Sequence, residues 1–371
     1  MSTSLDRLTI HGFKSIRALD NFELRPLNVL ISANGAGKSN FVDFFRMLRA
    51  FVDEALQANF VRMHDPEGLF FLGPKVTASL IGRLRFGENL YEFTLVPSTG
   101  GRVFIESERA QYTGAGGHAP LKALATGGFE SVLKARRNEP SASGAPHGVP
   151  WHVFSAISSW TVYHFHDTSF LAPMRREQSL HDNLQLRPDA SNIAAWLYAQ
   201  REQSEDLYTL IRDTVRLAAP FLDDFLLRPR MRGQNEMIAL ECTQRGSDFP
   251  FQAHQLSDGT LRLICLTATL MQAEMPSAII IDEPELGLHP VALGIVADLI
   301  RAAAARTQVI VATQSPTLLD YFEAEDVIVV DREGNESVFR RLDAPSLAEW
   351  LQDYSFGELW QKNVFDGGPH A

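Results

Sequence analysis

The sequence predicts an α/β protein built on a mixed β-sheet, because three apolar runs have the length and the setting of buried strands. Residues 27–31 form the first run, and an amphipathic stretch at residues 41–51 follows it after a short loop. Residues 278–281 and 309–312 form the other two runs, and each ends in polar residues. Runs of this kind, interrupted only by Asn28 in the first of them, are typical of parallel strands covered on both faces.

The loop after the first strand has the composition of a phosphate-binding loop. Residues 32–39 read Ser-Ala-Asn-Gly-Ala-Gly-Lys-Ser, and small residues let successive backbone N–H groups turn toward one anion. The helix that begins there adds the positive end of its dipole. Lys38 is expected to reach the β- and γ-phosphates of a nucleotide, and the Ser39 hydroxyl to bind Mg²⁺. The residues expected to bind the nucleotide here are Asn34, Gly35, Ala36, Gly37, Lys38, Ser39 and Asn40.

This loop departs from the usual pattern at one position. The pattern begins with Gly, whereas this chain has Ser32. A serine fits wherever the backbone does not need a positive φ, so the departure is compatible with phosphate binding. A Gly-rich turn between strand and helix that binds no ligand is the alternative interpretation.

Two adjacent carboxylates end the second apolar run. Asp282 and Glu283 lie at the carboxyl end of a predicted parallel strand, where ligand sites gather in open α/β sheets. Two carboxylates at such a place are costly without a partner, and a Mg²⁺-nucleotide supplies one. Asp282 is then expected to hold the metal and Glu283 to activate the attacking water. A strand end that simply runs into solvent is the alternative.

A third element lies at residues 256–260, which read Leu-Ser-Asp-Gly-Thr and precede a predicted helix at 261–271. Here the chain resembles the ABC-type ATPases of the branch that includes RecF, the SMC proteins and the OLD-like AAA ATPases, whose signature is Leu-Ser-Gly-Gly-Gln. Asp258 and Thr260 replace the first Gly of the pair and the Gln. Residues 284–290 look like the D-loop of that family. Residues 309–316 look like its switch strand and loop, with Gln314 where a His usually stands.

The resemblance implies a P-loop NTPase fold of ABC/RecF-SMC type, a mixed sheet with an antiparallel β patch and a helical lobe. It also implies that ATP and Mg²⁺ are bound between two subunits arranged head to tail, so that the chain forms a homodimer through ATP. Ser257 and Gly259 then contact the γ-phosphate from the second subunit, and Gln314 joins Glu283 as a catalytic residue that senses that phosphate. Gln178 is one candidate for the family's metal-contacting Gln. No heptad run predicts a coiled-coil arm, and the tail is too short for a TOPRIM nuclease domain.

Composition restricts the class of protein further. The chain has 371 residues, 45% of them hydrophobic, and a net charge of −11. A net negative charge does not favour a protein whose surface binds nucleic acid. No run approaches the ~20 apolar residues of a membrane span, and no signal peptide is evident, so a cytoplasmic location is expected. The two cysteines form neither a disulfide framework nor a metal-ligand pattern.

The pattern of strands and turns predicts four regions. Residues 1–113 form the first part of the nucleotide-binding lobe, with antiparallel strands near 80–86, 91–95 and 102–108. Residues 114–150 are a turn-rich, flexible insertion. Residues 151–248 form a helical and variable lobe, with helices over 191–218 that Ser191 or Asn192 can cap. Residues 249–371 complete the nucleotide-binding lobe with the signature, the Asp-Glu strand, the switch loop, a last strand at 327–330, a docking helix near 358–360 and a frayed end at 365–368.

Three functions remain open on this basis. The first is an ATP-hydrolysing conformational switch that acts on DNA or on a partner effector, in genome maintenance or antiphage defence. The second is an ATP-sensing scaffold with little turnover that restrains a partner toxin or nuclease. The third, less favoured, is the motor subunit of a transporter. Two basic clusters, one of Arg175 and Arg176 and one of Arg228, Arg230 and Arg232, are either solvated or contact a phosphate backbone.

Overall fold

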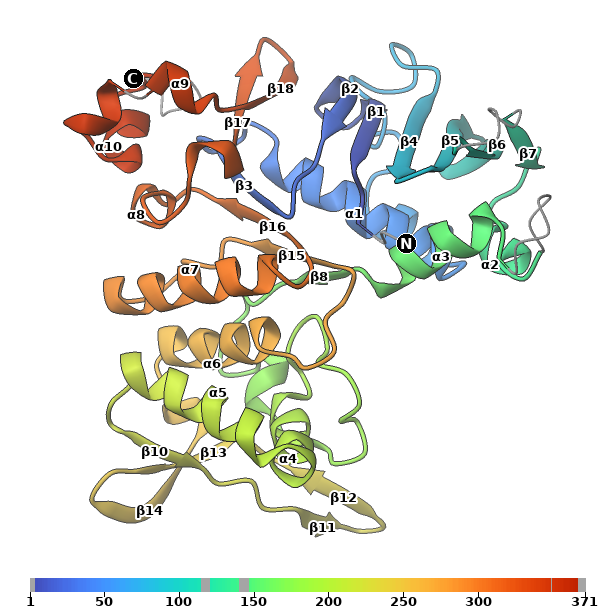
Figure 1. Ribbon diagram of the computed structural model, residues 1–371. Helices are drawn as coiled ribbons and strands as arrows, with labels where there is room; N and C mark the ends of the chain where they lie inside the picture. The colour runs from blue at the N-terminus through green and yellow to red at the C-terminus, as the bar shows by residue number, and fades with distance from the viewer. Residues whose placement is uncertain (1–3, 115–120, 140–146, 348, 366–371) are drawn as a thin grey trace.

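A computed structural model of the chain describes residues 4–114, 121–139, 147–347 and 349–365. In these residues, two large sheets lie side by side in the upper part of the molecule, and a helical lobe with two small sheets lies below them (Figure 1). The predicted α/β class with a mixed sheet, an antiparallel patch and a helical lobe is confirmed.

The central sheet holds the three apolar runs. Within the described chain its strands follow the order β18-β17-β3-β16-β15-β8. All neighbours are parallel except β17 and β18, which form an antiparallel hairpin at one edge. The bounds of the strands are β3 (Leu27–Ile31), β8 (Thr161–Tyr163), β15 (Ala278–Asp282), β16 (Gln308–Thr313), β17 (Val327–Glu333) and β18 (Glu336–Arg341).

Both faces of the three middle strands β3, β15 and β16 are buried, which explains why these strands are mostly apolar. Val29 and Ile31 of β3 pack into one hydrophobic core, whereas Leu30 packs into the other. The same alternation separates Ile279 from Ile280 on β15. One core contains α1 (Lys38–Val52), α3 (Val149–Ser159) and the antiparallel sheet. The other contains α4 (Ile193–Gln203), α5 (Glu205–Ala218), α6 (Asp258–Leu270) and α7 (Pro290–Ala304).

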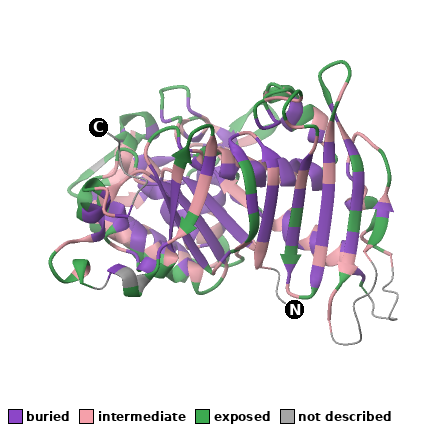
Figure 2. Ribbon diagram, turned by 90° about the horizontal axis from the view of Figure 1, so that it is seen from above, coloured by how far each residue is buried: buried purple, intermediate pink, exposed green. Residues whose placement is uncertain are grey.

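The antiparallel sheet covers the far side of α1. Its described strands follow the order β2-β1-β4-β5-β6-β7, and Figure 2 shows buried and exposed residues alternating along them. Phe44 and Phe51 of α1 contact Phe93 of β5, with ring centroids 6.3 Å and 4.8 Å apart. The strands are β1 (Arg7–Phe13), β2 (Ile16–Glu23), β4 (Leu80–Phe86), β5 (Asn89–Ser98), β6 (Arg102–Tyr112) and β7 (Lys122–Ala125).

The lower lobe carries two small sheets beneath α4 to α6. Its described strands are β9 (Gln178–Ser179), β10 (Leu222–Phe225), β11 (Arg230–Arg232), β12 (Asn235–Ile238), β13 (Glu241–Gln244) and β14 (Ser247–Gln252). The helices predicted at 191–218 are present as α4 and α5, but the predicted side-chain cap by Ser191 or Asn192 is wrong. Asn192 occupies the N-cap of α4 without capping it. Its side chain instead binds the carbonyls of Asp182 and Gln185 and the N–H of Arg187, because it closes the preceding loop.

The C-terminal segment continues past the strand predicted at 327–330. That strand is β17, and the prediction that it is the last one is wrong, because β18 follows and pairs with it. The predicted docking helix is α10 (Phe356–Gln361), whose N-cap Ser355 forms a capping box with Glu358. Residues 366–368 of the predicted frayed end lie outside the described residues. The remaining short helices are α2 (Leu133–Arg136), α8 (Pro316–Leu319) and α9 (Ala344–Leu347).

The longest described helices, α1 and α7, have 15 residues each. The described part of the chain therefore carries no coiled-coil arm, as predicted. After β18, the described residues form only short helices.

Candidate nucleotide-binding site

Three neighbouring parallel strands bring the predicted site residues to one edge of the central sheet. β16 lies between β3 and β15, with Ile31 opposite Thr313 and Ala312 opposite Asp282. The phosphate loop follows β3, Gln314 follows β16, and Glu283 follows β15. Segments that are far apart in the sequence therefore meet at the carboxyl ends of the strands, where open α/β sheets place their ligands.

The phosphate loop is fixed in shape by a hydroxyl from β18. Gly37 is the N-cap of α1 with a φ of +117°, a conformation that side chains rarely adopt. Ser337 Oγ donates to the carbonyl of Ala36 and lies 2.7 Å from Ser15 Oγ. A Cβ on Gly37 would lie 2.0 Å from Ser337 Oγ. The tight approach of β18 thus requires glycine at this position.

Lys38 is buried inside the loop. Only 5% of the residue is exposed, and its Nζ donates to the Ser32 carbonyl at 3.0 Å and to Ser32 Oγ at 2.7 Å. Burial lowers the pKa of Lys38, while the charges of Glu283, Glu285 and Asp282 oppose that change. Ser32, which stands where the usual pattern has Gly, is therefore an additional acceptor that orients the lysine.

The two carboxylates at the end of β15 lie in a setting that disfavours their charge. Asp282 is 8% exposed, and burial raises its pKa. Burial also raises the pKa of Glu283 to about 7, and the neighbouring Glu285 carboxyl adds to this effect. Gln314 Nε2 donates to Glu283 Oε1 at 2.7 Å. A bound cation would offset the cost of both buried charges.

Glu285 belongs to this group, although the sequence reasoning did not select it. Its Oε1 accepts from Thr313 Oγ1 at 2.6 Å and from the Gln314 N–H at 2.9 Å. Its Oε2 is buried and has no hydrogen-bond partner within the described residues. Glu285 therefore ties the turn after β15 to the end of β16. Its place three residues after Asp282 was the only sequence signal.

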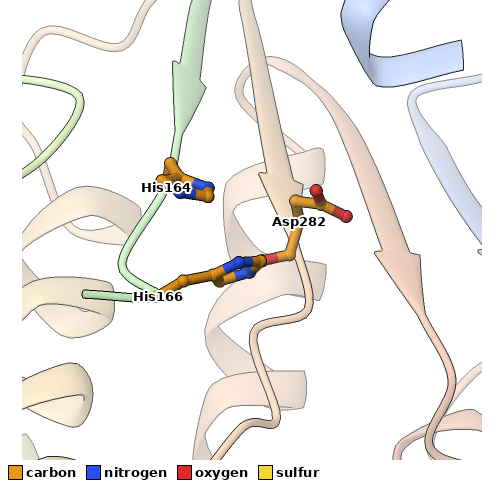
Figure 3. A group of neighbouring side chains, drawn as sticks. All are labelled: His164, His166 and Asp282. Carbon is orange, nitrogen blue, oxygen red and sulfur yellow. The ribbon is translucent and has the colours of Figure 1, made fainter. Parts of the chain in front are cut away.

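Two histidines after β8 also lie beside Asp282, and the sequence reasoning missed them. β8 pairs with β15 so that Tyr163 is opposite Ile281, which places His164 and His166 next to Asp282 (Figure 3). Gln178, the candidate from the sequence for the family's metal-contacting Gln, lies in β9 of the lower lobe. Its amide donates to the Arg176 carbonyl and accepts from the Ala194 N–H.

The signature residues lie on a separate element. Ser257 is the N-cap of α6, and its Oγ accepts from the Thr260 N–H at 3.2 Å. Gly259 packs so closely that a Cβ would lie 2.2 Å from the Gly287 carbonyl. In the described residues, no hydrogen bond joins this turn to the phosphate loop of the same chain. Ser257 is exposed and is available to a second molecule.

Two arginines connect the signature to the rest of the site. Arg175, nearly buried, binds the carbonyls of Ala253 and Leu256 and pairs with Asp258 at 2.7 Å. Arg262 of α6 donates to the carbonyls of three residues that flank Asp282 in space, namely Phe165 at 2.9 Å, His166 at 2.9 Å and Leu286 at 2.8 Å. A movement of α6 would therefore displace the backbone segments that hold these three carbonyls.

Comparison with known families agrees with this geometry. Residues 133–320, half of the chain, match the family described as "AAA domain, putative AbiEii toxin, Type IV TA system". The chain belongs to this AAA-domain family. The match includes the signature, the Asp-Glu strand and the switch loop, and it begins after the phosphate loop. No curated protein matches the chain.

Similarity to solved structures supports the fold of this AAA domain independently of the family match. The chain is similar to an Smc head bound to the C-winged helix domain of ScpA, with 14% identity, a TM-score of 0.58 and coverage of 93% of this chain and 99% of that one. It is also similar to an Smc head with an extended coiled coil bound to the C-terminal domain of ScpA derived from Pyrococcus furiosus. That match has 14% identity, a TM-score of 0.50 and coverage of 94% and 98%. These likenesses establish an SMC-head type of P-loop fold.

The basic clusters of the AAA domain are largely paired within the chain. Arg230 contacts both carboxylate oxygens of Glu241, at 2.7 and 2.8 Å, and Arg232 pairs with Glu177 at 3.2 Å.

Burial raises the pKa of Cys242 to about 12 and raises that of Cys265 as well, so both thiols are packed as small apolar groups. Across the described residues, no helix combines the length and the apolar character that crossing a bilayer requires.

Proposed function

We propose that the chain binds ATP with Mg²⁺ and hydrolyses it, and that two copies close around the nucleotide to form a switch that controls a partner protein. The observation that carries this proposal is the meeting of Lys38, Asp282, Glu283 and Gln314 at one edge of the central sheet. A positive loop for phosphate and a carboxylate pair for a metal are the two parts that phosphoryl transfer needs.

The residues fit a Mg²⁺-nucleotide on physical grounds. Lys38 is held inside a loop of backbone N–H donors at the N-terminus of a 15-residue helix. Among the described residues, no hydrogen bond reaches the Asp282 carboxylate, although only 8% of the residue is exposed. Ser39 and Asp282 would hold Mg²⁺, which would neutralise charge on the β- and γ-phosphates. Glu283 would accept the proton of the attacking water.

The second subunit would complete the site. Ser257 and Gly259 lie at the start of α6, a 13-residue helix whose N-terminus is exposed. Exposed N–H groups and a helix dipole favour a phosphate there. Because this turn makes no hydrogen bond to the phosphate loop of its own chain, we infer that it binds the γ-phosphate of nucleotide held by the other copy.

A partner protein is favoured over DNA as the target of the switch. The net charge is −11, and Arg230, Arg232 and Arg175 are already paired with carboxylates of the same chain. Few basic groups therefore remain in these clusters for a phosphate backbone. The family description names a toxin of a toxin–antitoxin system, and the Smc heads are bound to ScpA, so related folds act through proteins. An effector in defence or genome maintenance fits this pattern.

A scaffold with little turnover is the second candidate, and one contact favours it. Gln314 Nε2 donates to Glu283 Oε1, so this residue occupies the oxygen that would otherwise accept the proton of water. This contact predicts slow hydrolysis.

Three variants test the proposal. Lys38→Ala is expected to lose ATP binding, whereas the matched surface variant Lys134→Ala, which removes an exposed ion pair with Glu54, keeps it. Glu283→Gln is expected to bind ATP and to accumulate a dimer on size exclusion with ATP. Hydrolysis by Glu283→Gln at the wild-type rate would show that Glu283 is not the base. Steady-state hydrolysis with and without DNA separates the candidates: stimulation by DNA favours DNA as a target, and negligible turnover in both conditions favours the scaffold.

A further inference from the structure

His164, His166 and Asp282 form a compact group of metal-binding side chains at the edge of the central sheet. Each offers a ligand atom, and these atoms all lie within 4.8 Å of one another. They come from the ends of two adjacent parallel strands, β8 and β15 (Figure 3). Two ligands about 2.1 Å from one ion lie about 3 Å apart in cis. Binding one ion therefore requires these atoms to approach one another, which side-chain rotation can provide.

The backbone contacts of His166 prepare one of its ring nitrogens for a metal. His166 Nε2 lies 3.1 Å from the carbonyl oxygen of Asp282. A carbonyl only accepts, so Nε2 carries the hydrogen and, in the neutral ring, Nδ1 carries a lone pair. A second ring nitrogen that donates to a carbonyl is the usual support of a metal-binding histidine. Arg262 also binds the His166 and Phe165 carbonyls, which fixes this segment in place.

The other two groups are suitable in charge and access. The Asp282 carboxylate is buried, and no side-chain donor to it is recorded in the described part of the chain. A dication would offset that buried charge. His164 is exposed and packs against His166 with ring centroids 4.2 Å apart. An ion can therefore enter from the His164 side.

We propose that His164, His166 and Asp282 form a binding site for one first-row transition-metal dication, for which Mn²⁺ is the probe. Two imidazoles and one carboxylate favour a transition metal over Mg²⁺, which prefers oxygen ligands and retains its water. The inference shares one residue with the proposed function, because Asp282 is a metal ligand in both, and it rests on that function in no other way. It gives this edge of the sheet a transition-metal site in the nucleotide-free protein.

Binding of Mn²⁺ to the nucleotide-free full chain tests this inference. Electron paramagnetic resonance of free Mn²⁺ gives the affinity, with Mg²⁺ as competitor, and pulsed measurements detect ¹⁴N coupling from a bound imidazole. We expect one Mn²⁺ bound at least tenfold more tightly than Mg²⁺, with ¹⁴N coupling. His164→Ala and His166→Gln should each weaken binding at least tenfold, and Gln at 166 keeps a donor for the Asp282 carbonyl. His181→Ala, an exposed histidine in the lower lobe, should bind Mn²⁺ like the wild type.

The outcomes separate this inference from the proposed function. Mn²⁺ binding without ¹⁴N coupling, equal affinity for Mg²⁺, or no effect of either histidine variant would overturn the site. Lys38→Ala should lose ATP and retain Mn²⁺. If the wild type fails to bind ATP but binds Mn²⁺ through the histidines, the inference stands and the proposed function fails. Circular dichroism of each variant shows whether weakened binding reflects lost ligands or lost folding, and the ¹⁴N signal of the wild type decides the matter independently of the variants.

Discussion

Replacing Glu283 with Gln is expected to stabilise the nucleotide-free protein at pH 8 and to have less effect as the pH falls. The pKa of Glu283 is raised from 4.5 to about 7. Between these values the folded state holds a proton that the unfolded state has released, so folding stability decreases as the pH rises. Glutamine removes the buried charge, and its amide oxygen can still accept from Gln314.

The magnitude follows from the change in pKa. At about 1.36 kcal/mol per pKa unit, a rise from 4.5 to about 7 corresponds to about 3 kcal/mol above pH 7. Solvent reaches part of the Glu283 side chain and screens its charge, so we expect about half of this, ~1.5 kcal/mol. The gain should shrink toward zero as the pH falls toward 4.5.

Urea unfolding followed by tryptophan fluorescence, in EDTA and at several pH values between 5 and 8, measures this difference. Glu139→Gln, which removes a charge from an exposed ion pair with Arg136, controls for the loss of one negative charge and should change stability by less than ~0.5 kcal/mol. An equal gain at pH 5 and pH 8, or a loss at pH 8, would refute the idea that charge burial governs Glu283.

Three further predictions concern contacts around the site. Gly37→Ala should abolish ATP binding in a filter or fluorescence assay and lower stability by ~2–3 kcal/mol, because its Cβ would lie 2.0 Å from a serine hydroxyl. Gly35→Ala, with no atom near its Cβ, should cost only the ~1 kcal/mol of its positive φ; equal effects would argue against the clash. Arg262→Ala should lower the free energy of unfolding by ~2–4 kcal/mol, since it orphans carbonyls on both sides of the carboxylates; a surface-like loss under ~0.5 kcal/mol would contradict this. Arg175→Ala should cost at least ~2 kcal/mol in thermal unfolding, whereas Asp258→Asn, at the exposed end of the same pair, should cost less than ~1 kcal/mol.

The sequence predicted the parts of the site that are local in the chain. A loop of small residues between an apolar run and an amphipathic helix is a local pattern, so the position of Lys38 at the start of a helix could be predicted from residues 27–51 alone. The Asp-Glu pair was placed at a strand end by the apolar run that precedes it. The site roles of these residues remain predictions, because only their placement follows from the structure.

The parts that sequence reasoning missed depend on contacts between distant segments. His164 and His166 lie beside Asp282 only because the three-residue strand β8 pairs with β15, and a strand that short has no clear periodicity. Ser337 supports the phosphate loop from β18, a strand that was not predicted. Asn192 is a residue type that often caps helices, but its side chain binds the carbonyls of the preceding loop instead.

The position of β3 also governs the order in which the protein can assemble. Its two neighbours in the described chain are β16 and β17, and both follow β3 only after a long stretch of sequence. Until those neighbours are synthesised, this mostly apolar strand has both of its hydrogen-bonding edges unpaired, a state prone to aggregation. Pairing across so long a stretch of chain is slow. A nascent chain that stops before β16 therefore presents the whole loop sequence and yet lacks the scaffold that would give the loop its shape.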